Sequence, residues 1–153
     1  MLMMTAKVNK KKLLLGLAAL AAAVVAVILL FGGKDTPASV STVKNNDDRI
    51  RFLESYGWDV ATSPTESCQV RIPSDSSEVF QRYNALQKTM GYDLSAYAGK
   101  TVMRYVYTVK NYPGAKDPVY ATLLISGNQV IGGDITDTAP TGLMQGFQKT
   151  DAS

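Results

Sequence analysis

The chain has 153 residues, of which 46% are hydrophobic and 19% charged, and it contains no histidine and one cysteine. The lack of histidine excludes Ser-His and Cys-His nucleophilic pairs and most zinc sites. A single cysteine excludes an intrachain disulfide, and the length allows one domain or a small domain with an appendage.

The N-terminal region carries an uninterrupted apolar run of 19 residues, from Leu13 to Phe31. A helix of that length spans roughly 28 Å, close to the ~30 Å hydrocarbon core of a bilayer. The run therefore predicts one transmembrane helix (13–31) in contact with the lipid bilayer. The apolar part of a cleavable signal is usually shorter, about 7–15 residues. Small residues at Thr36-Pro37-Ala38 nevertheless keep cleavage near Ala38, and hence secretion, as the alternative.

The positive charge of the chain is concentrated ahead of that run. Four lysines precede it without an acidic residue, whereas Lys34 and Asp35 cancel just after it. The positive-inside rule places residues 1–12 in the cytoplasm and the C-terminal part outside the cell membrane. Without these four lysines, 12 basic residues face 13 acidic ones. This balance gives no electrostatic case for a nucleic-acid partner.

Composition then divides the rest of the chain. Residues 32–45 are rich in Gly, Ser, Thr and Pro, which is typical of a flexible linker. Residues 46–148 are long enough to form one small extracytoplasmic domain, and residues 149–153 form a tail.

The first elements of that domain are a helix and two short strands. A polar start at Asn46, apolar residues at helical spacing and a final Gly57 predict a helix. Alternating apolar residues predict strands at 58–60 and 68–72, which could pair as a hairpin.

A second helix is predicted from Asp75 to Gly91. Asp75-Ser76-Ser77-Glu78 resembles a capping box with Asp as the cap, and Gly91 supplies a stop. We expect the segment with Leu94 and Tyr97 to fold back over the core. The apolar stripe of this helix comprises Val79, Tyr83, Leu86 and Met90, with Phe80 beside it.

The remaining pattern predicts three strands and a short helical turn. The strands span 101–110, 119–125 and 129–136, with a two-residue turn at Gly127-Asn128. Leu143 and Phe147, four residues apart, predict one docked helical turn. The predicted fold is α+β, with two main helices on one face of a mostly antiparallel sheet of about five strands.

No motif for catalysis, a metal or a cofactor occurs in the chain. Cys68 occupies an inward position of its strand, which favours a buried core residue. Gly132 and Gly133, inside a strand, require a backbone without side chains. They indicate either a bulge or close packing beneath a helix or a tyrosine, or a ligand or partner strand whose polar contact is Asp134.

Tyrosine is the other distinctive residue type, because eight occur and all follow the apolar run. Four of them cluster near two adjacent predicted strands. They either pack against the second helix or form a recognition surface of large, rigid side chains. The candidate surface comprises Tyr105, Tyr107, Tyr112, Tyr120, Gly132, Gly133 and Asp134.

Three strings carry a resemblance to a known family: RIRFLESYGWDV, RYNALQKTMGYDLSAYAGKTVMRYVYTVKNYP and IGGDI. Over roughly residues 46–147 the chain resembles the bacterial family called domain of unknown function 4830. The resemblance implies an N-terminal hydrophobic segment and one small outer domain, as found chiefly in Gram-positive anaerobes. It implies no known activity, cofactor or catalytic residue.

Together these features predict a membrane-anchored outer domain that binds rather than catalyses. Its partner would be a ligand or another protein of the membrane or cell envelope. The alternatives are an envelope hydrolase that uses an acidic residue and a peptidase-inhibitor-like module.

Overall fold

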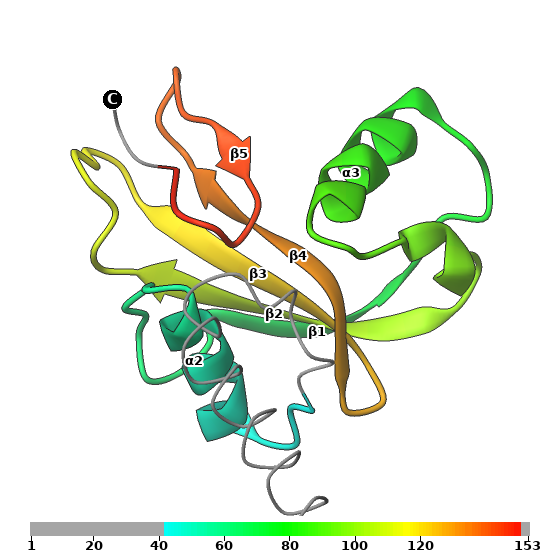
Figure 1. The fold of residues 1–153 in the computed structure, drawn as a ribbon, viewed down its shortest axis with the longest axis horizontal. Coiled ribbons are helices and arrows are strands. Elements are labelled where there is room, and N and C mark those ends of the chain that lie inside the picture. The colour runs from blue at the N-terminus through cyan, green and yellow to red at the C-terminus, as the bar shows by residue number, and fades with distance from the viewer. Residues whose placement is uncertain (1–41, 151–153) are drawn as a thin grey trace, which may run out of the picture. The chain divides into compact units, whose positions relative to one another are not determined.

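The computed structural model describes residues 42–150 of the chain (Figure 1). Within this range, no helix has both the length and the apolar character needed to cross a membrane. The predicted basic N-terminus, the transmembrane helix at 13–31, the cleavage site near Ala38 and most of the predicted linker lie outside the described residues.

The described domain is built on a single antiparallel sheet. Its strands follow the order of the chain, β1-β2-β3-β4-β5, and each pairs with its sequence neighbours. Two helices and a 3-10 turn accompany them, which confirms the α+β class. The strands are β1 (Glu66–Arg71), β2 (Thr101–Val109), β3 (Val119–Ser126), β4 (Gln129–Asp137) and β5 (Met144–Gln145).

Side-chain caps start the helical elements. Helix α2 (Asn46–Ser55) follows Asn45, whose side chain accepts a hydrogen bond from the backbone N–H of Asp48. Helix α3 (Glu78–Thr89) follows Ser77, whose hydroxyl accepts from the N–H of Phe80. The predicted cap at Asp75 was therefore wrong by two residues, because Ser77 is placed where its oxygen meets an unpaired N–H of the first turn.

The 3-10 turn η1 (Leu94–Tyr97) follows α3 and closes over the core as predicted. Asp93 caps it by accepting from the backbone N–H of Ser95. Leu94 is 1% exposed, and Asn84 of α3 accepts a hydrogen bond from its N–H at 2.7 Å. The turn is thus fixed to α3 on one side and to the sheet on the other.

The two helices lie on opposite faces of the sheet, and the prediction of one shared face was wrong (Figure 1). Helix α2 packs on the face that carries Tyr107, Ala121 and Leu123, which we call the α2 face. Helix α3 and η1 pack on the other face, over Val102 and Leu124, which we call the α3 face. The physical reason is that the central strand β3 is buried on both faces, with Ala121 and Leu123 on one and Leu124 on the other, so both sides need cover.

The strand containing Cys68 and the segment around Val60 do not form a hairpin with each other. Strand β1 pairs with the first part of β2, between Thr101 and Val106, whereas Val60 forms a bridge with Val109 farther along the same strand. Both segments pair with the same edge of β2, one after the other along that strand, so they do not pair with each other.

The C-terminal segment is extended and not helical. Met144 and Gln145 form β5 against Ile135 and Thr136. Phe147 is completely buried, as the prediction of a docked tail requires, but Leu143 is 72% exposed. The spacing of four was misleading because the segment is not helical: a strand of two residues and then a bend at Phe147-Gln148 carry the two side chains into different surroundings.

Candidate functional site

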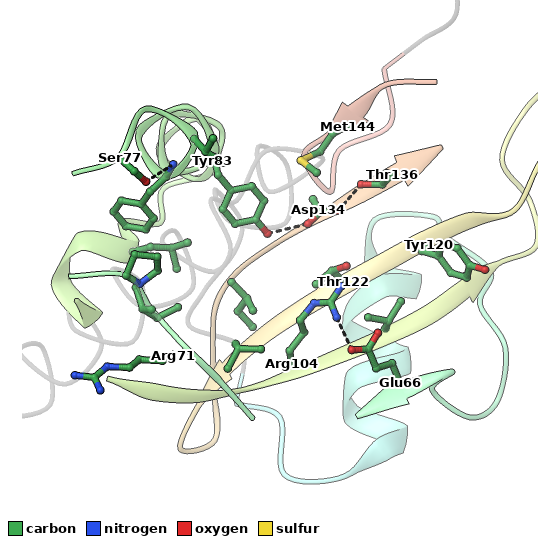
Figure 2. A pocket seen from close by; sticks show the side chains of 18 of the residues that line it. Glu66, Arg71, Ser77, Tyr83, Arg104, Tyr120, Thr122, Asp134, Thr136 and Met144 are labelled. Atoms are coloured by element: carbon green, nitrogen blue, oxygen red, sulfur yellow. Dashed lines mark hydrogen bonds and ion pairs between the residues drawn. The ribbon is translucent and has the colours of Figure 1, made fainter. Parts of the chain in front are cut away.

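The α3 face carries an open cleft, because α3 and η1 cover only part of it. The cleft has a volume of about 810 Å³. Strands β1 to β4 form its floor, α3 and η1 form one wall, and Met144 of β5 lies at the rim near Tyr83 and Asp134 (Figure 2). Such a volume is in the range of natural ligand sites, roughly 300–1,000 Å³.

A buried carboxylate, Asp134 of β4, lies on the floor where α3 meets the sheet. Its side chain is only 4% exposed. The hydroxyl of Tyr83 donates to its Oδ2 at 2.7 Å, and the hydroxyl of Thr136 donates to its Oδ1 at 2.7 Å. Burial raises the pKa of Asp134 even though these hydrogen bonds and nearby Arg104 act in the opposite direction. Burial and the adjacent carboxylate also raise the pKa of Tyr83.

A cation, Arg104 of β2, lies on the same floor toward β1. Its Nη1 is 2.7 Å from Oε1 of Glu66, and the two side chains are 34% and 50% exposed. Thr122 lies between Arg104 and Asp134 (Figure 2). The register explains this arrangement, because Glu66, Val106, Thr122 and Asp134 lie opposite one another across four strands. The floor therefore presents positive, hydroxyl and negative groups in succession.

Apolar side chains make the inner wall and the rim of the cleft. Phe80, Leu94 and Leu124 line its inner part. At the rim, Val79 is 80% and Met144 50% exposed. Exposed apolar side chains around a concave, partly polar floor are typical of an interaction site.

Gly132 lets α3 approach β4 closely at one border of this cleft. The side-chain amide of Gln87 donates to the carbonyl of Gly133 at 2.9 Å and accepts from its N–H at 2.8 Å. Gln87 is completely buried and pairs with β4 as a neighbouring strand would. A Cβ on Gly132 would lie 2.6 Å from Oε1 of Gln87 and 3.2 Å from Leu94.

Gly133 serves the opposite face. Its φ is +156°, and a Cβ there would collide with the carbonyl oxygen of Thr122 and lie 2.5 Å from Cζ of Phe147. A register shift at Leu124/Ile125 adds a bulge beside the glycine pair. The structure thus shows close packing beneath a helix, together with a bulge, for Gly132 and Gly133.

Comparison with known families shows to which family the chain belongs. The model of a family described as "Domain of unknown function (DUF4830)" matches residues 52–135, more than half of the sequence. The chain belongs to this family. No curated protein and no solved structure matches it.

The DUF4830 match spans most of the cleft. It includes Tyr83, Arg104 and Asp134, and it ends at residue 135, before β5 and Met144. In the described part of the DUF4830 domain, no three Cys, Asp or Glu side chains come together as metal ligands.

The four clustered tyrosines do not form one surface in the DUF4830 domain. Tyr105 and Tyr107 share the α2 face, where the guanidinium of Arg49 lies 3.8 Å from the centre of the Tyr105 ring. Tyr107 is completely buried, so the alternative of packing holds for it. Its partner, however, is α2, the first helix of the domain, whereas the prediction named the second helix, α3. Its hydroxyl donates to Asn46 and accepts from Arg49, each at 2.8 Å.

The other two tyrosines are divided between the faces. Tyr112 stacks on Trp58 on the α2 side, with ring centres 5.8 Å apart. Tyr120 lies on the α3 face and lines the cleft. Of the seven candidate residues, only Tyr120 and Asp134 line the cleft itself, with Gly132 and Gly133 at its border.

Cys68 is not a core residue. It is partly exposed on β1, and its thiol donates to Oε1 of Glu66 at 3.3 Å. Its strand position was predicted correctly, but β1 lies at the edge of the sheet where α3 does not cover it. The alternation therefore predicted which face of β1 carries Cys68, but it did not predict how deeply the side chain is buried.

Arg104 and Tyr83 were not predicted as site residues. A signal for Arg104 was present, because a charge stands between Val102 and Val106 on the same face of a strand. Tyr83 was placed in the apolar stripe of its helix, and its neighbours Asn84 and Gln87 gave no apolar signal for the buried side of α3.

Proposed function

We propose that this DUF4830 protein is a membrane-anchored extracytoplasmic binding module whose cleft on the α3 face holds a partner protein of the cell envelope. The observation that carries the proposal is the placement of exposed apolar residues. Within residues 42–150, three large hydrophobic side chains are exposed: Val79, Leu143 and Met144. Two of them border the cleft, and Leu143 directly precedes Met144 in the chain.

The chemistry of the floor supports binding over catalysis. Asp134 is the candidate acid or base, but its two oxygens already accept hydrogen bonds from Tyr83 and Thr136. Because it is 4% exposed, a substrate has little access to it. These contacts suit a carboxylate that fixes α3 to β4 and shapes the cleft.

Attachment at the N-terminal side is compatible with this use of the cleft. Residue Thr42 enters the described domain beside Gln129, at the β3–β4 turn. The cleft residues Tyr120 and Thr136 are at the opposite ends of β3 and β4. A membrane anchor at 13–31 would raise the local concentration of the domain near membrane partners, so modest affinity would suffice.

Photo-crosslinking in native membranes tests the binding site. A photoreactive residue replaces Val79, Met144 or, as the control, Lys116 in an exposed loop away from the cleft residues. We expect a discrete protein adduct from Val79 and Met144 and none from Lys116. Equal labelling from all three positions, or no adduct from a well-folded protein, would contradict the proposal.

Membrane attachment is tested separately. We expect alkaline carbonate to leave the full-length protein in the membrane pellet and protease added to intact cells to remove the C-terminal domain. Release by carbonate, or a protected domain, would refute the anchor or the topology. A protein found only in the medium and beginning after Ala38 would favour the secreted alternative.

A further inference from the structure

The ligand chemistry of the cleft is set by a cation with spare hydrogen-bonding capacity. A guanidinium has five N–H donors in a rigid fork. Within the described residues, Arg104 makes one ion pair, from Nη1 to Oε1 of Glu66. Its side chain lines the cleft and is 34% exposed, so its remaining N–H groups are accessible to a ligand.

Glu66 is a weakly held partner for this cation. It lies on the edge strand β1, its side chain is 50% exposed, and it contributes one oxygen. Exposed ion pairs of this kind contribute little to stability. An incoming carboxylate can therefore replace Glu66 at small cost and occupy the fork of Arg104 with both of its oxygens.

The surroundings of Arg104 define the rest of the ligand. Thr122 places a hydroxyl beside it and Tyr120 places another farther along β3, and these can donate to or accept from backbone amides. Phe80 and Val79 offer an apolar wall across from this polar row. An extended peptide matches both halves, because its backbone alternates donors and acceptors and its side chains can be apolar.

We infer that the cleft takes an extended peptide segment that presents a carboxylate to Arg104 and apolar side chains to the wall formed by Phe80 and Val79. The inference rests on the proposed function and specifies its partner chemistry. Glu66 then acts as an internal competitor that occupies Arg104 when no peptide is bound.

Binding of two matched peptides to the full-length protein in detergent micelles tests this. The first is Ser-Leu-Glu-Leu-Ser with blocked ends and an uncharged fluorescent dye, and the second carries Gln in place of Glu. Fluorescence anisotropy should show at least tenfold tighter binding of the Glu peptide, because hydrogen bonds to charged groups are worth about that much or more.

Three variants assign the preference to its residues. Arg104→Gln should abolish the difference between the peptides. Glu66→Gln should tighten binding of the Glu peptide severalfold, a gain that misfolding cannot produce. Arg51→Gln is the matched control, because it removes the same charge from an exposed side chain of α2, which packs on the opposite face of the sheet. We expect it to change affinity less than twofold.

A third peptide distinguishes the source of the carboxylate. It carries Gln in place of Glu and a free C-terminus after the last Leu. Binding that depends on Arg104 assigns the site to a chain end, and preference for the blocked Glu peptide assigns it to an acidic side chain.

Failure of this inference differs from failure of the proposed function. Equal binding of the Glu and Gln peptides, no binding of any peptide, or a preference that survives Arg104→Gln would refute the peptide carboxylate. If adducts from Val79 and Met144 still form, the cleft binds a partner of other chemistry. If those adducts are absent too, both proposals are wrong.

Discussion

The two faces of the sheet differ in how completely they are covered. The α2 face carries one continuous cluster of buried residues that extends from Val43 to Phe147. On the α3 face the buried cluster is smaller and is followed by the open cleft. One face therefore supplies most of the apolar burial, which leaves part of the other face free to bind.

Polar groups show the same contrast. On the α2 face the hydroxyl of Tyr107 is held by Asn46 and Arg49. On the α3 face, Tyr120 lines the cleft and Arg104 keeps donors without protein partners among the described residues. Substitutions on the two faces should therefore separate stability from binding.

The largest expected effect comes from Gly133, where β4 meets the packed α2 face. Gly133→Ala places a Cβ against Thr122 and Phe147 and should lower the free energy of unfolding by more than about 2 kcal/mol. Urea denaturation of the full chain measures it. Gly114→Ala is the control, because its φ is +69° but nothing lies within 4 Å of the added Cβ. It should cost about 1–2 kcal/mol, and an equal cost at both positions would show that close packing is irrelevant.

Next in size is the contact by which α3 covers the edge of β4. Gln87→Leu leaves the buried N–H and C=O of Gly133 without their partner and should cost about 2–3 kcal/mol. The matched change Gln81→Leu, on the exposed side of α3, removes one exposed hydrogen bond to the carbonyl of Ser76 and should cost less than about 1 kcal/mol. Thermal denaturation of both variants decides this, and similar midpoints would show that the amide pairing adds nothing.

A pair of tyrosines compares the faces directly. Tyr107→Phe removes a buried, doubly bonded hydroxyl and should cost about 1 kcal/mol, whereas Tyr120→Phe should change stability by less than about 0.5 kcal/mol. Peptide affinity should show the reverse order, with weaker binding only for Tyr120→Phe. Loss of stability at Tyr120 would mean that the cleft floor is part of the core.

The smallest effect is a pH dependence from Asp134. Because burial raises its pKa in the folded state, the native protein holds this proton more tightly than the unfolded chain. Its contribution to stability is therefore greatest below pH ~4, the ordinary Asp value. It falls as pH rises through the folded pKa. Asp134→Asn should remove this decline from denaturation curves measured between pH 4 and 7.

The contribution of Asp93 to stability should depend on pH in the opposite direction, and it provides the internal control. Hydrogen bonds from Asn84 and Ser95 lower its pKa to about 2. Its stabilising effect is present above pH ~4 and is lost as pH falls toward 2. Asp93→Asn should therefore change the acid limb of the curve and leave the region above pH 4 as in the wild type.

The sequence alone determined the elements of this domain to a large extent. Period-two alternation located β2, and apolar runs next to turn signals located β3 and β4, with Gly127-Asn128 at the turn between them, because backbone geometry and turn chemistry are local. Of the two interpretations of the glycine pair, the one of close packing with a bulge is confirmed. Local signals failed at the cap of α3 and at β5, where two nearby polar residues or a spacing of four allowed more than one solution.

Only the tertiary structure decided which face each element covers. Strand β3 is buried on both faces, but its sequence does not say which helix covers which face. The cleft could not be predicted from local patterns either, because Tyr83, Arg104 and Asp134 come from three separate elements. They come together only through the strand register and the approach of α3 over Gly132. Long-range register is fixed by the packing of the whole core, and no window of local sequence contains it.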